Sequence, residues 1–149
     1  MTAAALPVSI ITGYLGAGKT TFINQLLTHP NELAITILVN DFGSISIDNA
    51  LIESQSADTI TLANGCICCT LGGSLVTTLC SVLDAPHRPD WLIIEASGVA
   101  EPAKLYSIAK AEPDLSLENV ICLVDCATIS DWLSDHDVGL VVARQVQQS

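Results

Sequence analysis

The fold of this chain is decided by residues 8–21, which read VSIITGYLGAGKTT. Within them, residues 13–20 fit the pattern G-x-x-x-x-G-K-[S/T] of a phosphate-binding loop. The apolar residues 8–11 before the loop predict a buried strand, and residues 20–28 after it have the apolar spacing of a helix. Strand, loop and helix in this order are the setting that the motif requires, so a glycine-rich turn that fits by chance is the weaker interpretation.

The residue types of this loop explain how it would hold a phosphate. Glycine allows backbone conformations that are closed to other residues, so successive N–H groups can point at one anion, and the N-terminus of the next helix adds its dipole. Lys19 is expected to reach the β- and γ-phosphates, and the Thr20 hydroxyl to ligate Mg²⁺. The predicted nucleotide-binding residues of the loop and the start of the helix are Gly13, Gly16, Ala17, Gly18, Lys19, Thr20 and Thr21.

Composition limits the class of protein. With 149 residues the chain suffices for one domain with a sizeable core, and 50% of its residues are hydrophobic. Lys and Arg total 5 against 16 Asp and Glu, a net charge of −11. Nucleic acids and anionic membranes are therefore disfavoured as partners, because both require a basic surface. No apolar stretch approaches the length of a membrane span, and residues 1–5 are expected to be a flexible tail.

Strand and helix patterns alternate along the chain and predict an α/β fold, in which helices cover both faces of a buried sheet. The expected architecture is the three-layer sheet of P-loop nucleoside triphosphatases. Strands are expected at 6–12, 33–39, 58–63, 91–95 and 118–125. Helices are expected at 20–28, 72–83, 103–110, 127–133 and from 138 onward. Residues 44–56 carry few clear signals.

Two acidic residues follow expected strands, at the end where α/β sheets bind ligands. Asp41 could hold Mg²⁺ or a second metal, or be a turn residue with local hydrogen bonds, and neither interpretation is favoured. Glu95 is expected to hold Mg²⁺ or its water shell and to act with Lys19 in catalysis, the alternative being a strand-end glutamate beside a turn. Gly98 would approach the γ-phosphate, so that residues 97–102 order with a triphosphate and relax after hydrolysis.

The sequence contains 6 cysteines, of which Cys66, Cys68 and Cys69 lie within four residues. Nucleotide hydrolysis belongs to the reducing cytosol, where clustered cysteines more often bind metal than form disulfides. Because thiolates favour Zn²⁺ and Cu(I), the cluster predicts a transition-metal site open enough for a carrier or a sensor. A redox pair and a buried turn of small residues are the alternatives. The remaining cysteines lie among apolar residues and are expected in the core: Cys80, Cys122 and Cys126.

Four stretches carry a resemblance to a known family: residues 13–20 (GYLGAGKT), 40–43 (NDFG), 65–69 (GCICC) and 95–102 (EASGVAEP). Together they resemble the CobW-type GTPases, a family of P-loop GTPases linked to metal homeostasis and metallochaperone work. That family is related to the nickel-insertion GTPases of hydrogenase and urease. The cysteine motif is the most specific part of the resemblance, because it separates this family from other P-loop proteins.

The resemblance implies a role for each motif. Gly16, Gly18 and Lys19 would bind the phosphates of GTP, Thr20 would bind Mg²⁺, and Glu95 would serve the Mg²⁺ or the attacking water. The three cysteines of the motif would bind a transition metal, most often taken to be zinc, and couple it to GTP turnover. At position 41 the family usually has glutamate, so the acid is kept here with a side chain one methylene shorter.

The resemblance also implies features that these 149 residues do not contain. GTPases of this type read guanine with an Asn-Lys-x-Asp motif, and the family has a C-terminal domain with a histidine-rich segment. We therefore expect residues 6–149 to be the N-terminal part of a P-loop GTPase domain, whose incomplete sheet exposes an apolar edge and invites a homodimer. The expected function is a cytoplasmic GTP-hydrolysing metallochaperone domain that serves a client metalloprotein. The alternative is a truncated, non-catalytic module that binds metal or a partner, and a P-loop ATPase or kinase is a weaker option.

Overall fold

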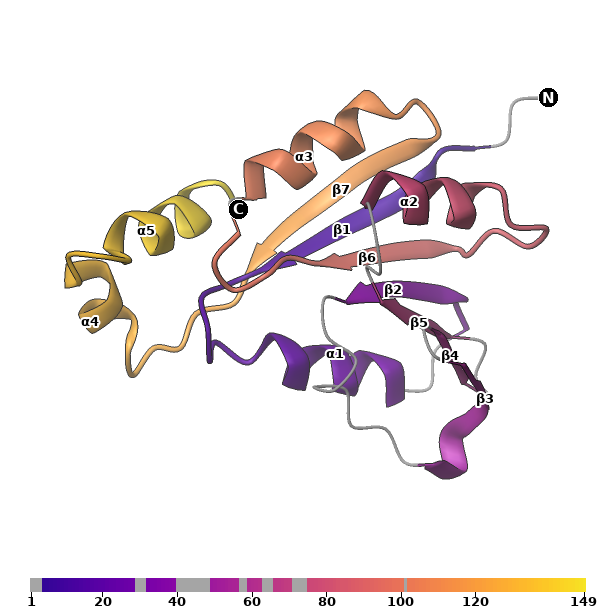
Figure 1. Ribbon diagram of the computed structural model, residues 1–149, viewed down its shortest axis with the longest axis horizontal. Coiled ribbons are helices and arrows are strands. Elements are labelled where there is room, and N and C mark those ends of the chain that lie inside the picture. The colour runs from indigo at the N-terminus through magenta and orange to yellow at the C-terminus, as the bar shows by residue number, and fades with distance from the viewer. Residues whose placement is uncertain are drawn as a thin grey trace.

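The structure, a computed structural model, describes residues 4–28, 32–39, 49–56, 59–62, 66–70, 75–100 and 102–149. In this part of the chain, seven strands form one mixed sheet with helices on both faces (Figure 1). The strands are β1 (Leu6–Thr12), β2 (Ile35–Val39), β3 (Ile52–Gln55), β4 (Thr59–Leu62), β5 (Ile67–Thr70), β6 (Trp91–Glu95) and β7 (Leu115–Cys122). The helices are α1 (Lys19–Thr28), the 3₁₀ helix η2 (Asn49–Leu51), α2 (Leu75–Leu83), α3 (Pro102–Ala111), α4 (Ile129–Ser134) and α5 (Gly139–Gln147).

The strand order of the sheet is β3-β4-β5-β2-β6-β1-β7. Strands β5, β2, β6, β1 and β7 run parallel to one another, whereas β3 and β4 add an antiparallel hairpin beside β5. In the register, Ile11 of β1 is opposite Glu95 of β6, and Thr12 is opposite Cys122 of β7. The carboxyl ends of β6, β1 and β7 therefore meet at one edge of the sheet, and α4 and α5 lie beyond this edge (Figure 1).

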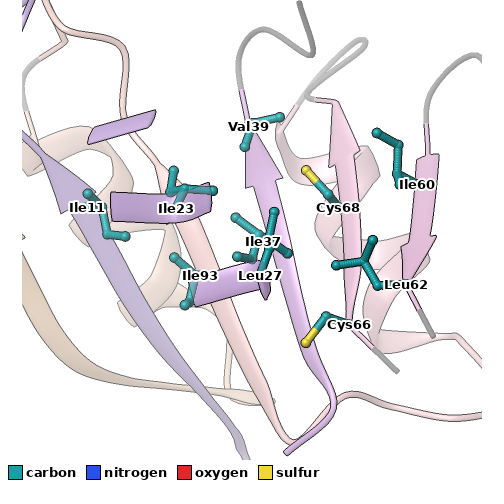
Figure 2. Close-up of a cluster of buried hydrophobic side chains, with 10 residues drawn as sticks. All are labelled: Ile11, Ile23, Leu27, Ile37, Val39, Ile60, Leu62, Cys66, Cys68 and Ile93. Carbon is teal, nitrogen blue, oxygen red and sulfur yellow. The ribbon is translucent and has the colours of Figure 1, made fainter. Parts of the chain in front are cut away.

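Two apolar cores flank the sheet. On one face, α1 packs against β1, β2, β4, β5 and β6, and its buried Ile23 and Leu27 are four residues apart, as one helix face requires (Figure 2). On the other face, α2 and α3 cover a second cluster that includes Leu79 of α2 and Leu38 of β2. Each fully buried aliphatic side chain contributes about 1.5–3 kcal/mol, so the two cores fix the sheet that carries the loops.

Most of the expected elements are present, and their bounds shift by a few residues. The strand expected at 118–125 begins and ends earlier, as β7. Its early residues are polar because β7 is an edge strand with half-exposed side chains, so it does not require a continuous apolar run. Two short strands were not predicted, β3 in the segment with few signals and β5 across the cysteine motif.

The expectation that the remaining three cysteines belong to the core is wrong. Cys80 and Cys126 are exposed, and Cys122 is only half-buried. Cys80 directly follows the buried Leu79 on α2, so it turns toward solvent where Leu79 turns inward. The predictions for the first three residues and for Asp41 lie outside the residues that the structure describes. None of the helices in the described part has the length and apolarity needed to cross a bilayer.

Candidate functional site

The loop between β1 and α1 is curled by three glycines with positive φ angles. Gly13 has φ 140°, Gly16 has φ 79° and Gly18 has φ 94°. A Cβ atom added to Gly13 would collide with the carbonyl oxygen of Leu123, which follows β7. Around Gly16 and Gly18, by contrast, no heavy atom of the described residues other than their chain neighbours lies within 4 Å of where a Cβ would stand. The loop therefore has the backbone freedom and the open space that an anion cradle requires.

Lys19 is the first residue of α1, and its ammonium group is folded back over the loop. Its Nζ donates hydrogen bonds to the carbonyl oxygens of Gly13, at 2.8 Å, and Tyr14, at 3.3 Å. Only 8% of Lys19 is exposed, and this burial lowers the pKa of its ammonium group, while the negative charges of Glu95 and Cys122 act in the opposite direction. A phosphate at the loop would meet a buried cation that already faces it.

Glu95 ends β6 at the same edge of the sheet. It is buried, with 9% of the residue exposed, and the next residue, Ala96, donates its N–H to the Ile11 carbonyl at 2.8 Å. Glu95 is therefore held one strand away from the phosphate loop, close enough that its charge partly offsets the lowering of the Lys19 pKa by burial. Thr20, the second residue of α1, is half-buried and carries a hydroxyl directly after Lys19. Carboxylate and hydroxyl oxygens are ligands that Mg²⁺ prefers, so these two residues fit this ion.

Gly98 lies directly against the phosphate loop. A Cβ atom at this position would stand 2.6 Å from Leu15 Cδ2 and 3.1 Å from the backbone nitrogen of Leu15. A side chain here would displace the exposed Leu15 side chain and crowd the Leu15 backbone nitrogen, so glycine allows the closest approach. The segment after β6 and the loop after β1 are thus in contact, as a segment that senses a γ-phosphate requires.

Two residues at this edge were not found from the sequence. Gln145 of α5 is buried, with 1% exposed, and its Nε2 donates hydrogen bonds to the carbonyls of Gly98, at 3.0 Å, and Ala100, at 3.1 Å. Trp132 of α4 packs on Tyr14 of the loop, with ring centroids 4.9 Å apart. The one available signal was a polar residue three positions after Val142, on the buried face of α5.

The cysteine motif is not gathered into one three-thiol cluster. Cys66 and Cys68 are fully buried in the core on the α1 side of the sheet (Figure 2), whereas Cys69 packs against the core on the opposite side. The cause is the alternation of side chains along β5, which sends neighbouring residues to opposite faces. Thr59 of β4 donates its hydroxyl to Cys69 Sγ at 3.6 Å.

A site that uses all three thiols does not fit this arrangement. Among the described residues, no group of three or more His, Cys, Asp or Glu could hold a metal ion. Burial raises the pKa of the Cys68 thiol to about 12, and the charges of Cys69 and Glu95 add to the rise. Because Asp41 lies outside the described residues, its metal role stays a prediction.

Comparison with protein families and with curated proteins gives one consistent result. Residues 7–149 match the family model described as CobW/HypB/UreG, nucleotide-binding domain. The chain is 35% identical over 143 residues to the zinc chaperone CobW of Sinorhizobium sp, covering 89% of this chain and 40% of that protein. It is 35% identical over 156 residues to the zinc-regulated GTPase metalloprotein activator 1 of Dictyostelium discoideum, covering 90% of this chain and 32% of that protein.

A third relative is also known as a structure. The chain is 32% identical over 142 residues to the zinc chaperone YjiA of Escherichia coli K12, covering 90% of this chain and 45% of that protein. The Zn(II)-bound YjiA GTPase superposes with a TM-score of 0.71 at 27% identity, over 92% of this chain and 46% of that one. A Zn(II)-bound triple variant of YjiA, with one glutamate and two cysteines replaced by alanine, gives 0.72 at 25% identity, over the same shares of the two chains. These matches confirm the expected P-loop fold, and the chain spans less than half the length of these relatives.

Proposed function

Because the chain belongs to the CobW/HypB/UreG family of nucleotide-binding domains, we propose that it binds GTP and hydrolyses it with Mg²⁺. The observation that carries this proposal is the buried Lys19 ammonium, held by the Gly13 and Tyr14 carbonyls above a loop of positive-φ glycines. Two of the matched relatives are named GTPases, which supports guanine as the base.

In the proposed reaction, the chain positions and stabilises charge. The N–H groups of the loop, from Gly13 through Ala17 to Thr21, surround the phosphates, and Lys19 exchanges its carbonyl partners for β- and γ-phosphate oxygens. Thr20 and Glu95 would hold Mg²⁺ or its water shell, and this ion would supply positive charge that stabilises the charge on the phosphates. Water attacks the γ-phosphorus, the bond to the β–γ bridging oxygen breaks, and the proton of the water passes by way of Glu95 to the phosphate released beside GDP.

We propose that zinc, or another transition metal, is the cargo of the domain and binds at the cysteine motif. The names of the zinc-chaperone relatives support zinc. Cys66, directly before β5, and Cys68 in β5 lie in the same core on the α1 side of the sheet, so they can approach the same ion. Cys69 could join them only if β5 rearranged, because it lies on the other face. Strand β2 pairs with both β5 and β6, which provides a direct connection between the motif and Glu95.

The proposed partners follow from this role. A client metalloprotein would receive the metal in the cytoplasm, where thiols stay reduced. A second copy of the chain could pair along β7, whose outer edge has no neighbouring strand in the described part of the sheet and carries the exposed Ile121. Analytical ultracentrifugation over a range of concentrations tests the dimer.

The nucleotide proposal is tested by calorimetry with GTP, GDP and ATP in the presence of Mg²⁺, followed by phosphate release. Lys19→Met removes charge-assisted hydrogen bonds of about 1.5–3 kcal/mol, so GTP affinity should fall by roughly one to two orders of magnitude. Lys104→Met, an exposed site on α3, is the matched control and should leave affinity unchanged. Absence of GTP binding to the unmodified chain, or equal affinity of Lys19→Met, would overturn the proposal.

The metal proposal is tested by competition between the protein and a zinc-binding dye. The double variant Cys66→Ser/Cys68→Ser should lose tight zinc binding, whereas Cys69→Ser should lose less, because Cys69 lies on the other face of the sheet. Cys80→Ser, an exposed thiol on α2, serves as the control. Unchanged zinc affinity in the double variant would show that the metal binds elsewhere.

A further inference from the structure

The segment that follows β6 is held from two sides. On one side, Gly98 packs against Leu15 of the phosphate loop. On the other side, Gln145 of α5 donates from one amide nitrogen to the carbonyls of both Gly98 and Ala100. Just beyond the segment, the Ala103 N–H at the start of α3 donates to Gln148 Oε1 at 3.3 Å. Helix α5 therefore contacts this segment and the helix after it through two glutamines on neighbouring turns.

Gln145 has an unusual balance of hydrogen bonds for a buried residue. Both hydrogens of its amide nitrogen are used, one for each carbonyl. Its Oε1 atom, also buried, has no hydrogen-bond partner among the described residues. Since buried polar atoms are nearly always paired, this acceptor calls for an explanation. A second arrangement of residues 97–100 that turns a backbone N–H toward Oε1 would satisfy it.

Helices α4 and α5 form one unit that also contacts the phosphate loop. A Cβ atom added to Gly139, the first residue of α5, would stand 2.6 Å from the Leu133 carbonyl oxygen of α4, so the two helices are closely joined. From α4, Trp132 packs on Tyr14. Tyr14, Leu15, Trp132 and Gln145 line one narrow pocket between the loop and the two helices. A displacement of Gly98 would therefore act directly on α4 and α5 through these contacts.

We propose that Gln145 is a positioning residue that holds Gly98 in its nucleotide-free place, and that α4 and α5 shift when a triphosphate takes the Gly98 N–H. This inference rests on the proposed function, because it assigns the route by which the γ-phosphate is sensed. The phosphate would accept from the Gly98 N–H, whereas Gln145 donates to the Gly98 and Ala100 carbonyls, so the two contacts compete through the placement of the segment and not for one atom. A charge-assisted bond to phosphate is stronger than a neutral bond between amides, so a triphosphate that draws the segment toward the loop can break the Gln145 contacts. A nucleoside diphosphate has no γ-phosphate, so the Gln145 contacts stay in place when it binds.

The test compares Gln145→Met, which keeps the length of the side chain but donates no hydrogen bond, with Gln147→Met, an exposed site on the same helix. Hydrogen exchange without nucleotide should become about tenfold faster at the Ala100 amide in Gln145→Met only, because two hydrogen bonds to the segment are lost. The ratio of GTP to GDP affinity should also rise in Gln145→Met, since its nucleotide-free state no longer holds Gly98. Gln145→Glu, which loses the donors but stays polar, should give the same two changes if the methionine variant does not fold.

Nucleotide-dependent fluorescence of Trp132 reports the movement of the helices, with Trp132→Phe as the blank. The unmodified chain should give different signals with GTP and GDP, and Gln145→Met should reduce that difference. Exchange and affinity ratios in Gln145→Met that equal those of Gln147→Met would overturn the inference. If the unmodified chain binds no nucleotide, the proposed function fails, and the exchange measurement still decides whether Gln145 positions the segment.

Discussion

Replacing Gly13 and Gly16 with alanine, one at a time, separates the structural part of the phosphate loop from its binding part. Both glycines have positive φ angles, 140° and 79°. They differ in surroundings, because a methyl group at Gly13 collides with the Leu123 carbonyl, whereas at Gly16 it meets no atom within 4 Å among the described residues beyond its chain neighbours. We therefore expect Gly13→Ala to lose stability, and Gly16→Ala to lose mainly nucleotide affinity.

The magnitudes follow from these two environments. At Gly13 the rarely populated backbone conformation costs about 1–3 kcal/mol, and overpacking against a fixed carbonyl adds about 1–3 kcal/mol. The reduced conformational entropy of the unfolded alanine variant offsets about 0.4–1 kcal/mol, so the net loss of stability is roughly 1–5.5 kcal/mol. At Gly16 only the backbone strain of about 1–2 kcal/mol applies. The reduced entropy of the unfolded chain again offsets about 0.4–1 kcal/mol, so the net loss of stability is roughly 0–1.5 kcal/mol.

Thermal and denaturant unfolding followed by circular dichroism measure this contrast. For a domain of this size, each kcal/mol lowers the melting temperature by about 3 °C, so the midpoints of the two ranges place Gly13→Ala roughly 8 °C below Gly16→Ala. Calorimetry with GTP should give the reverse order of loss, because the Gly16 methyl enters the open space beside the loop. Equal melting temperatures for the two variants would refute the argument that Gly13 is confined by Leu123.

Two further predictions concern the rest of the sheet and its thiols. Ser9→Ala should lower the free energy of unfolding by about 1–3 kcal/mol, because the Trp91 indole nitrogen, 3.0 Å from Ser9 Oγ, loses its hydrogen-bond acceptor. The control Ser81→Ala, at an exposed site, should change the free energy of unfolding by less than about 0.5 kcal/mol, and denaturant titrations measure both variants. At pH 8, Cys122 should react with iodoacetamide more slowly than Cys80, because burial raises the pKa of the Cys122 thiol and leaves less thiolate. Mass spectrometry should show the difference between the two reaction rates shrinking as the pH rises. Equal rates at pH 8 would contradict this prediction.

The elements nearest the phosphate loop were predictable because their signals are local. The apolar run of β1, the glycines of the loop and the spacing of α1 lie in one continuous stretch, so a short window contains the whole arrangement. Strand β5 was missed for the opposite reason. A turn signal, Asn64-Gly65, precedes the run from Cys66 to Cys69, but the run has no alternation of polar and apolar residues, and three thiols so close together favour a ligand cluster over a strand. Its strand conformation depends on hydrogen bonds to β2 and β4, which come from elsewhere in the chain.

The contact made by Gln145 shows a second limit. Its partners, Gly98 and Ala100, precede it by 47 and 45 residues, so no local pattern connects them. The acid of Glu95 could be recognised because a strand end is a local feature. Gln145, which holds the segment after that strand, can be identified only from the folded structure, in which α5 packs beyond the edge of the sheet.

The position of β5 in the sheet has a consequence for how fast a metal could move. This strand is hydrogen-bonded on both sides, in a parallel ladder to β2 and an antiparallel ladder to β4. Bringing Cys69 to the same side as Cys66 and Cys68 would require both ladders to part at once. Such an event is a local opening, whose frequency is set by the stability of the surrounding structure rather than by the strength of sulfur–metal bonds. If the proposed metal site recruits Cys69, its loading and release would follow the rate of this local opening, and a partner that separates the β3–β4 hairpin from β5 would speed both steps.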